Sequence, residues 1–102
     1  MSEDPHISSY LFWKLSILIA TLDKIHELIS RKTEDIELDV DDKAYLDSAR
    51  LILKSAEVSL DSIKDVIESL KTPSARNYFF NLYNNAKEKL DLILEEINKR
   101  KY

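Results

Sequence analysis

Apolar residues recur along three stretches of the chain at alternating steps of four and three residues. The first stretch, Tyr10 to Ile29, carries a stripe of six such residues, namely Leu11, Leu15, Leu18, Leu22, Ile25 and Ile29. Side chains at this spacing repeat every seven residues and lie on one side of an α-helix. The pattern therefore predicts a long amphipathic helix over about residues 9–32, in which Ser8 or Ser9 caps the first turn.

The same spacing continues in two later stretches. The second stripe consists of Leu46, Ala49, Leu53, Ala56, Leu60, Ile63, Ile67 and Leu70, and the third of Phe79, Tyr83, Ala86, Leu90, Ile93 and Ile97. Thr72 and Pro73 separate the two stripes, and this pair is typical of a helix start, because threonine caps helices and proline is tolerated at the first helical position. We therefore expect two further helices, over about residues 41–71 and 73–100.

Short connections between the predicted helices favour a simple topology. Three long helices joined in this way form an antiparallel up-down-up bundle. The expected fold is therefore an all-α three-helix bundle with a single domain over residues 8–102, preceded by a flexible tail over residues 1–7. The closing phrases LDKIHELI, LDSIKDVI and LDLILEEI are similar to one another, which is typical of an internal helix repeat.

The connection between the first two helices is acidic and alternates apolar with polar residues. Ile36, Leu38 and Val40 lie two residues apart, which predicts an extended segment with one side against the bundle. The last acids of the connection, Asp39, Asp41 or Asp42, are candidates to cap the second helix.

Composition narrows the classes of function. The 102 residues include no glycine and no cysteine, so the chain has no thiolate ligand, no thiol nucleophile and no glycine-rich phosphate loop. The longest charge-free apolar run, Leu15 to Leu22, is far shorter than the ~20 residues of a membrane-spanning helix. We expect a soluble, intracellular (cytoplasmic) protein with no membrane partner. The net charge of −4 disfavours broad binding to nucleic acid.

No group of residues has the spacing of a catalytic or metal site. His26 lies near Asp23 and Glu27, but the other predicted helices supply no second histidine. The acidic connection lacks the glycine and the spaced glutamate of a calcium loop. We therefore expect no enzyme activity, no catalytic residue, no cofactor and no metal.

A second set of apolar residues points away from the stripes. On the first helix the set consists of Tyr10, Trp13, Ile17 and Ala20, and on the second of Leu51 and Val58. Exposed apolar patches of this kind mark contacts with a partner. The leading hypothesis is a small non-catalytic bundle, such as an adaptor, that binds another protein or itself through these residues. In the alternative interpretation, the tail, residues 36–40 or a further helical packing covers them.

The start of the third helix combines amides, aromatic residues and a cation. Arg76, Asn77, Asn81 and Asn84 form an edge that could hydrogen-bond to unpaired bases, with Tyr78 and Phe80 nearby for stacking. The alternative function is therefore a nucleic-acid-associated bundle that binds single strands. The other interpretation of this segment is a core stripe with a polar edge.

The segment Arg76 to Tyr83, RNYFFNLY, also resembles the Arg-Asn-x-x-x-His-x-Tyr motif of the HEPN helical-bundle ribonucleases. The preceding helix is similar to that of the toxin branch of this family at Arg50, Ile52, Glu57, Leu60, Asp61 and Ile67. Asn81 stands where the family has its catalytic histidine, and only residues 72–75 separate Lys71 from Arg76, where the family has a longer segment. Because asparagine cannot act as an acid or base near pH 7, the resemblance implies a degenerate relative without ribonuclease activity.

Overall fold

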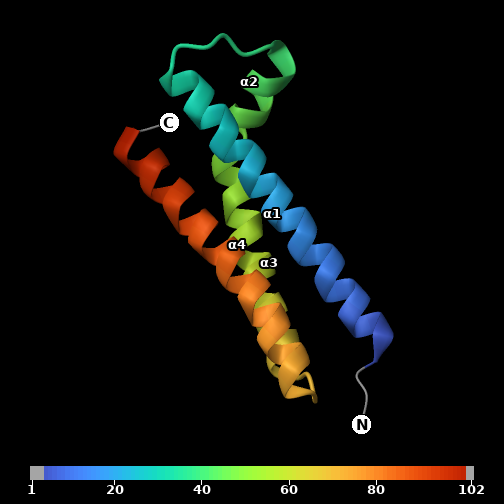
Figure 1. Cartoon of the computed structure of the whole chain (residues 1–102). Coiled ribbons are helices and arrows are strands. Elements are labelled where there is room, and N and C mark those ends of the chain that lie inside the picture. The colour runs from blue at the N-terminus through green and yellow to red at the C-terminus, as the bar shows by residue number, and fades with distance from the viewer. Residues whose placement is uncertain (1–3, 101–102) are drawn as a thin grey trace.

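The computed structural model describes residues 4–100, and within this range every regular element is a helix. The four helices are α1 (Pro5–Thr33), α2 (Val40–Asp47), α3 (Ala49–Glu68) and α4 (Pro73–Arg100). Figure 1 shows that α1 rises from the N-terminal end, α3 returns beside it, and α4 runs in the direction of α1. The prediction of an all-α protein with bundle-like packing is confirmed.

Helix α1 begins at Pro5 rather than at residue 9. The side chain of Asp4 accepts a hydrogen bond from the backbone N–H of His6 at 2.8 Å, and Pro5 occupies the first turn. Proline there removes no intrahelical hydrogen bond, so this pair is an efficient helix start. The cap is therefore Asp4 and not Ser8 or Ser9. Of the predicted tail, residues 5–7 are helical and residues 1–3 lie outside the described residues.

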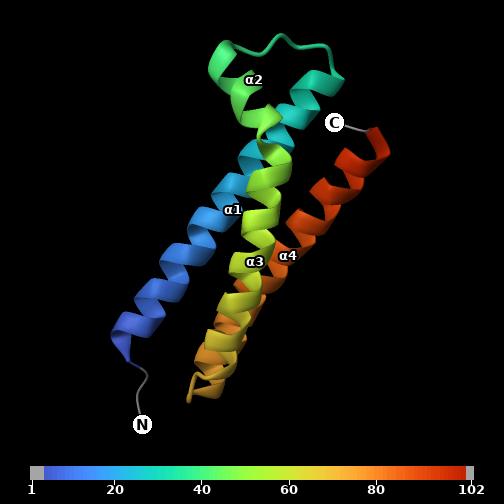
Figure 2. The ribbon, with the colours of Figure 1, turned by 180° about the vertical axis from the view of Figure 1, so that it is seen from behind.

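The helix predicted over residues 41–71 is divided at Ser48, so that the described range holds four helices where three were expected. The Ser48 hydroxyl donates to the carbonyl of Ala44 at 3.1 Å, and its N–H bonds to Ala44 and Tyr45. Serine that bonds back to the preceding turn bends or ends helices. Figures 1 and 2 show α2 at an angle to α3, across the end of the bundle.

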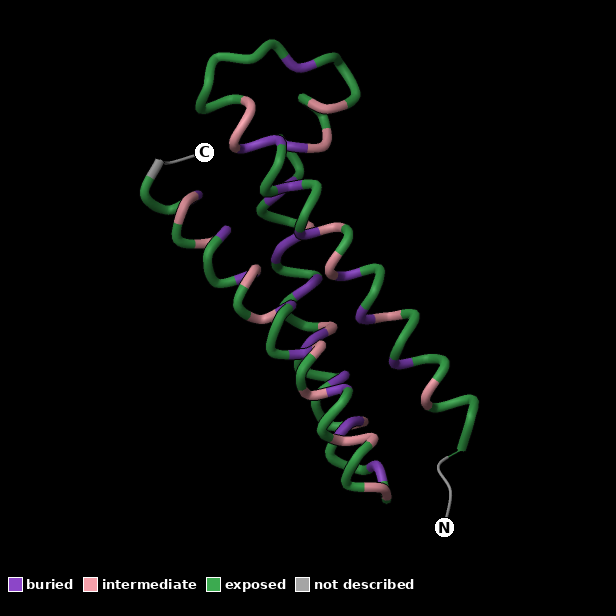
Figure 3. The backbone as a smooth tube through the Cα atoms, viewed as in Figure 1, coloured by how far each residue is buried: buried purple, intermediate pink, exposed green. Residues whose placement is uncertain are grey.

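The core lies around α4. Both α1 and α3 pack most extensively against α4, whereas the contact between α1 and α3 is much smaller. Every residue of the three stripes is buried (Figure 3), and two residues outside the stripes, Leu28 and Leu38, are buried with them. The result is an elongated molecule of 53 × 24 × 19 Å, in which two flanking helices share one central neighbour.

The acidic connection between α1 and α2 packs against the bundle through one residue. Leu38 is buried, but Ile36 and Val40 are exposed, so the expected alternating contact with the bundle was wrong at two of its three positions. The side chain of Asp39 accepts from the N–H of Asp42 at 2.7 Å and caps α2. The ammonium of Lys24 lies 4.4 Å from the ring centroid of Tyr45, which holds α2 against α1.

Candidate interaction surface

The N-terminal half of α1 is apolar on nearly every side. Between Ile7 and Leu22 the only charged residue is Lys14. The stripe on one side is buried in the bundle, yet Tyr10, Trp13 and Ile17 on the other sides are 42, 58 and 44 % exposed. Ala20, the fourth predicted contact residue of α1, is exposed as well. Apolar side chains thus lie on the covered inner side of this segment and on its exposed outer sides, where Ser9 and Ser16 are exposed as well.

Helix α3 adds two more large apolar side chains to the surface. Leu51 and Val58 are 74 and 61 % exposed, and because they are seven residues apart they lie on one side of the helix. Between α1 and α3 runs a groove of ≈ 340 Å³, lined by Lys14, Leu18 and Thr21 from α1 and by Leu51, Ile52, Ser55, Ala56 and Ser59 from α3. The groove exists because α1 and α3 each pack on α4 more than on one another.

Three of the predicted contact residues line or flank this groove. Tyr10 and Ile17 each lie one helical turn from a groove residue of α1, Lys14 and Thr21 respectively, and Leu51 lines the groove itself. Trp13 and Ala20 lie further round α1, and Val58 lies on the outer side of α3. We call the surface formed by the groove and its apolar rims the α1–α3 face; its rim residues are Tyr10, Trp13, Ile17, Ala20, Leu51 and Val58.

Some residues of this surface were missed from the sequence. Ser55 and Ser59 line the groove, next to the small stripe residue Ala56. Phe12 is 53 % exposed on the opposite shoulder of α1, and Ile7 is exposed in the turn that was expected to be part of the tail. The signal for these serines was present, because small residues that recur near an apolar stripe mark a place where another helix can approach closely.

Nothing among residues 4–100 covers the α1–α3 face. The connection that includes Ile36 and Leu38 was one candidate cover, but it lies at the other end of α1 from Tyr10 and Trp13 (Figures 1 and 2). The acidic connection and the apolar half of α1 are therefore separated by the length of the helix.

The predicted nucleic-acid edge is not assembled as a cluster. The guanidinium of Arg76 donates to the carbonyl of Leu70, so that it ties the start of α4 to the end of α3. Asn77, Asn81 and Asn84 are exposed on the outer side of α4. The same helical spacing continues with the acidic residues Glu88, Asp91 and Glu95. The ammonium of Lys87 forms an ion pair with the carboxylate of Asp91 at 3.5 Å. The row of three asparagines is thus continued by acids along α4, and Arg76 is bonded to Leu70.

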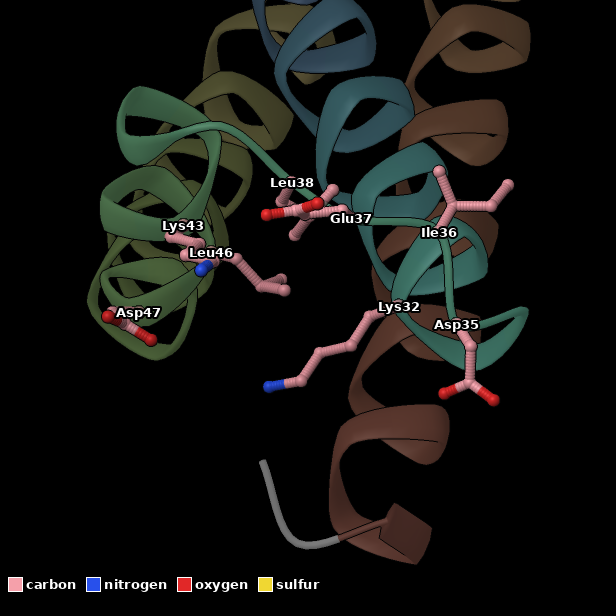
Figure 4. Close-up of a pocket in the computed structure, with 8 residues that line it drawn as sticks. All are labelled: Lys32, Asp35, Ile36, Glu37, Leu38, Lys43, Leu46 and Asp47. Atoms are coloured by element: carbon pink, nitrogen blue, oxygen red, sulfur yellow. The ribbon is translucent and has the colours of Figure 1, made fainter.

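A hollow of ≈ 380 Å³ lies beneath the acidic connection. Figure 4 shows Lys32 extending from the end of α1 into the space between α1 and α2, and Lys43 and Asp47 line the hollow from α2. Leu38 and Leu46 provide an apolar floor, and Asp35 and Glu37 add further negative charge. The hollow is therefore lined by charges of both signs around an apolar floor.

Residues that could hold a metal do not converge within the described range. Among residues 4–100 no three histidine or acidic side chains come together as a metal site. His26 lies beside a shallow depression with Glu34 and Glu96, which provides no second histidine. No helix in the same range is long and apolar enough to cross a membrane.

Comparison with known proteins does not place the chain in a family. No protein-family model matches it, and neither curated proteins nor solved structures include a significant match. The resemblance of residues 76–83 to the HEPN motif therefore rests on those residues alone. In the structure the guanidinium of Arg76 donates to the carbonyl of Leu70, and Asn81 is exposed.

Proposed function

We propose that this protein is a small non-catalytic helical bundle that binds a protein partner through the α1–α3 face. The observation that carries the proposal is the N-terminal half of α1, which exposes Tyr10, Trp13 and Ile17 although its other side completes the core. Interfaces are depleted in charged residues at their centre and enriched in aromatic ones. The segment Ile7 to Leu22, with Lys14 as its one charge in a chain that is 33 % charged, has this composition.

Trp13 is the expected anchor of the contact. Tryptophan and tyrosine are the residues that most often dominate binding energy, and the fully buried ring of a partner-bound tryptophan contributes about 2 kcal/mol or more. Trp13 already projects from the helix, so a partner can bury it without rearrangement of the bundle. Its exposure of 58 % leaves most of the indole for such a contact.

We also propose a more detailed architecture for the bundle. We interpret the three long segments as an up-down-up arrangement of heptad-patterned helices, in which α2 is the bent start of the second one. The similar phrases that begin at Leu22 and Leu90 are consistent with an internal repeat. Support comes from the ion pair between Asp23 and Lys89, which shows that these two phrases lie at the same level of the bundle.

The proposal is tested by site-specific photo-cross-linking. A photoreactive phenylalanine analogue is placed at Trp13 in one variant and at Asn84, on the outer side of α4, in a control variant. Each purified variant is irradiated alone and in an extract of the organism that encodes the protein. We expect defined products from position 13 and none from position 84. Equal labelling from both positions, or no product from position 13, would refute the proposed surface.

The alternative proposal is a nucleic-acid-associated bundle. The feature in its favour is the exposed row of Asn77, Asn81 and Asn84. The acids that continue this row disfavour a phosphate backbone, because affinity for nucleic acid depends on neutralising its charge with cations. Binding of single-stranded RNA at low salt is the discriminating measurement, and a lack of binding there eliminates this class.

A further inference from the structure

We infer that the bend at Ser48 is a conformational switch, in which α2 and α3 join into one continuous helix over residues 40–68 when α2 is released from α1. In the structure α2 is docked against α1. The inference concerns the end of the bundle that carries the acidic connection, so it does not depend on the proposed function of the α1–α3 face. Three observations support it, namely the local chemistry of the bend, the start of α3 and the contacts of α2.

The residues around the bend are compatible with a helix. The chain has no glycine, and its two prolines lie at the starts of α1 and α4. The hydroxyl of Ser48 bonds back to the carbonyl of Ala44, which accompanies many helix bends. The hydroxyl of Ser30 makes the same bond to His26 at 3.0 Å, and α1 continues past it. The back-bond of Ser48 therefore permits the bend without requiring it.

The apolar pattern and the hydrogen bonds both continue through the bend. Leu46 of α2 and Ala49 of α3 are buried and keep the three-residue step of the stripe. The N–H of Ser48 bonds to the carbonyl of Ala44 at 3.2 Å, and its carbonyl accepts from the N–H of Ile52 at 3.0 Å. Both are bonds between residues four apart, as in an α-helix. Rotating φ and ψ of Ser48 by roughly 30° and 40° gives this residue α-helical dihedral angles.

The start of α3 lacks the groups that usually stabilise a helix N-terminus. The first N–H groups of a helix have no partner within it, and a capping side chain or an acid in the first turn normally stabilises them. Ser48 occupies the N-cap position of α3, but its side chain makes no capping bond and the first turn contains no acid. In a continuous helix the N–H groups of Ala49 and Leu51 would bond to the carbonyls of Tyr45 and Asp47. The break is therefore unfavourable for the backbone.

Contacts between α2 and α1 offset this cost. The ammonium of Lys24 lies 4.4 Å from the ring centroid of Tyr45, and the guanidinium of Arg31 lies 3.7 Å from the carboxylate of Asp42. Leu28 of α1 is buried beside Asp42. Within residues 4–100 the backbone of α2 approaches α1 and α3 but not α4. The bend is thus held by one neighbouring helix, through contacts whose cations are partly exposed.

Release of α2 changes which surfaces are covered. Lys43 and Asp47 of α2 form one wall of the hollow of ≈ 380 Å³, so the hollow opens when α2 moves away. Leu28 loses its neighbour on α2 at the same time. The connection over residues 34–39 spans up to about 20 Å when extended, which allows both positions of α2.

Nuclear magnetic resonance of the isotope-labelled chain tests the inference. The double variant Lys24→Ala/Arg31→Ala removes both contacts. Each contact favours the docked form by a factor of a few, so the ratio of released to docked chain should rise by on the order of 10-fold. The Cα chemical shift of Ser48 should move toward the helical value. The amide protons of Ala49 and Leu51 should exchange more slowly with solvent, because they gain hydrogen-bond acceptors.

Lys87→Ala is the matched control, because it removes an ion pair with Asp91 that lies on α4. It should leave the chemical shift of Ser48 unchanged, and the shifts of α3 and α4 in every variant report that the bundle stays folded. An unchanged Ser48 shift in the double variant would show that these contacts do not hold the bend. Random-coil shifts throughout residues 40–47 would show that released α2 unfolds instead of joining α3. Either result, or equal changes in the control, overturns the inference.

Discussion

The outer sides of α1 and α4 belong to neighbouring helices of one bundle, and they are opposite in character. Along α4 one row of exposed positions is polar or acidic at steps of four and three residues, namely Asn77, Asn81, Asn84, Glu88, Asp91 and Glu95, and the exposed apolar side chains of this helix are Tyr78 and Leu92. Along the first half of α1 the outward positions are Tyr10, Trp13, Ile17 and Ala20. Both helices bury an equally regular stripe on their inner side.

This difference concerns the exposed sides of the two helices and not the buried stripes that hold them in the bundle. The polar side of α4 shows that an outward side of this bundle can be fully solvated while the inner stripe holds the helix in place. The apolar side of α1 likewise lies outside the buried core, and in water it is a liability for aggregation. Under the proposed function, a contact with a protein partner accounts for its presence.

The largest effect is expected at the inner side of α1. Leu15 is fully buried, and Leu15→Ala should lower the free energy of unfolding by about 2–5 kcal/mol, because it removes apolar contacts and leaves a cavity. Urea unfolding followed by circular dichroism measures this value. This loss of unfolding free energy is the reference value for a buried position of α1. A loss below about 1 kcal/mol would contradict the assignment of Leu15 to the core.

Trp13→Ser probes the outer side of the same helix, two residues away. We expect the free energy of unfolding of the monomer to change by no more than about 0.5 kcal/mol, as at other exposed sites. Self-association or partner binding should weaken by about 2 kcal/mol, roughly 30-fold in the dissociation constant. Stability is measured at a concentration where the native chain is monomeric. A loss of stability comparable with that of Leu15→Ala would remove the contrast between the two sides of α1.

Arg76→Ala probes the edge between α3 and α4. Its guanidinium donates to the carbonyl of Leu70, so the substitution should lower the free energy of unfolding by about 1–2 kcal/mol. Asn81→Ala, one turn further along the outer side of α4, should change it by less than about 0.5 kcal/mol. Chemical denaturation of both variants provides the comparison. Arg76→Ala could instead leave the free energy of unfolding unchanged and abolish binding of single-stranded RNA. That result would show that the polar side of α4 binds nucleic acid.

Much of the core was predictable because burial along a helix follows its periodicity. The stripes from Leu11 to Ile29 and from Phe79 to Ile97 are buried throughout, and Tyr10, Trp13 and Ile17 are exposed as their helical positions predict. Leu28 was missed, since it lies outside the stripe and becomes buried at the end of α1 where α2 packs. The bend at Ser48 was missed for a related reason, because the apolar spacing continues from Leu46 to Ala49 without interruption.

The sequence by itself thus determined that the chain is helical, which side of each helix is apolar, and that the first half of α1 has apolar residues to spare. Only the tertiary structure decided that α4 is the central helix, that Arg76 is used at the α3–α4 turn, and that a groove lies open beside Tyr10 and Ile17. The physical reason is that periodicity is a local property of one helix, set by its 3.6 residues per turn. Which helices become neighbours, and which surfaces remain uncovered, depends on how all of their stripes pack together.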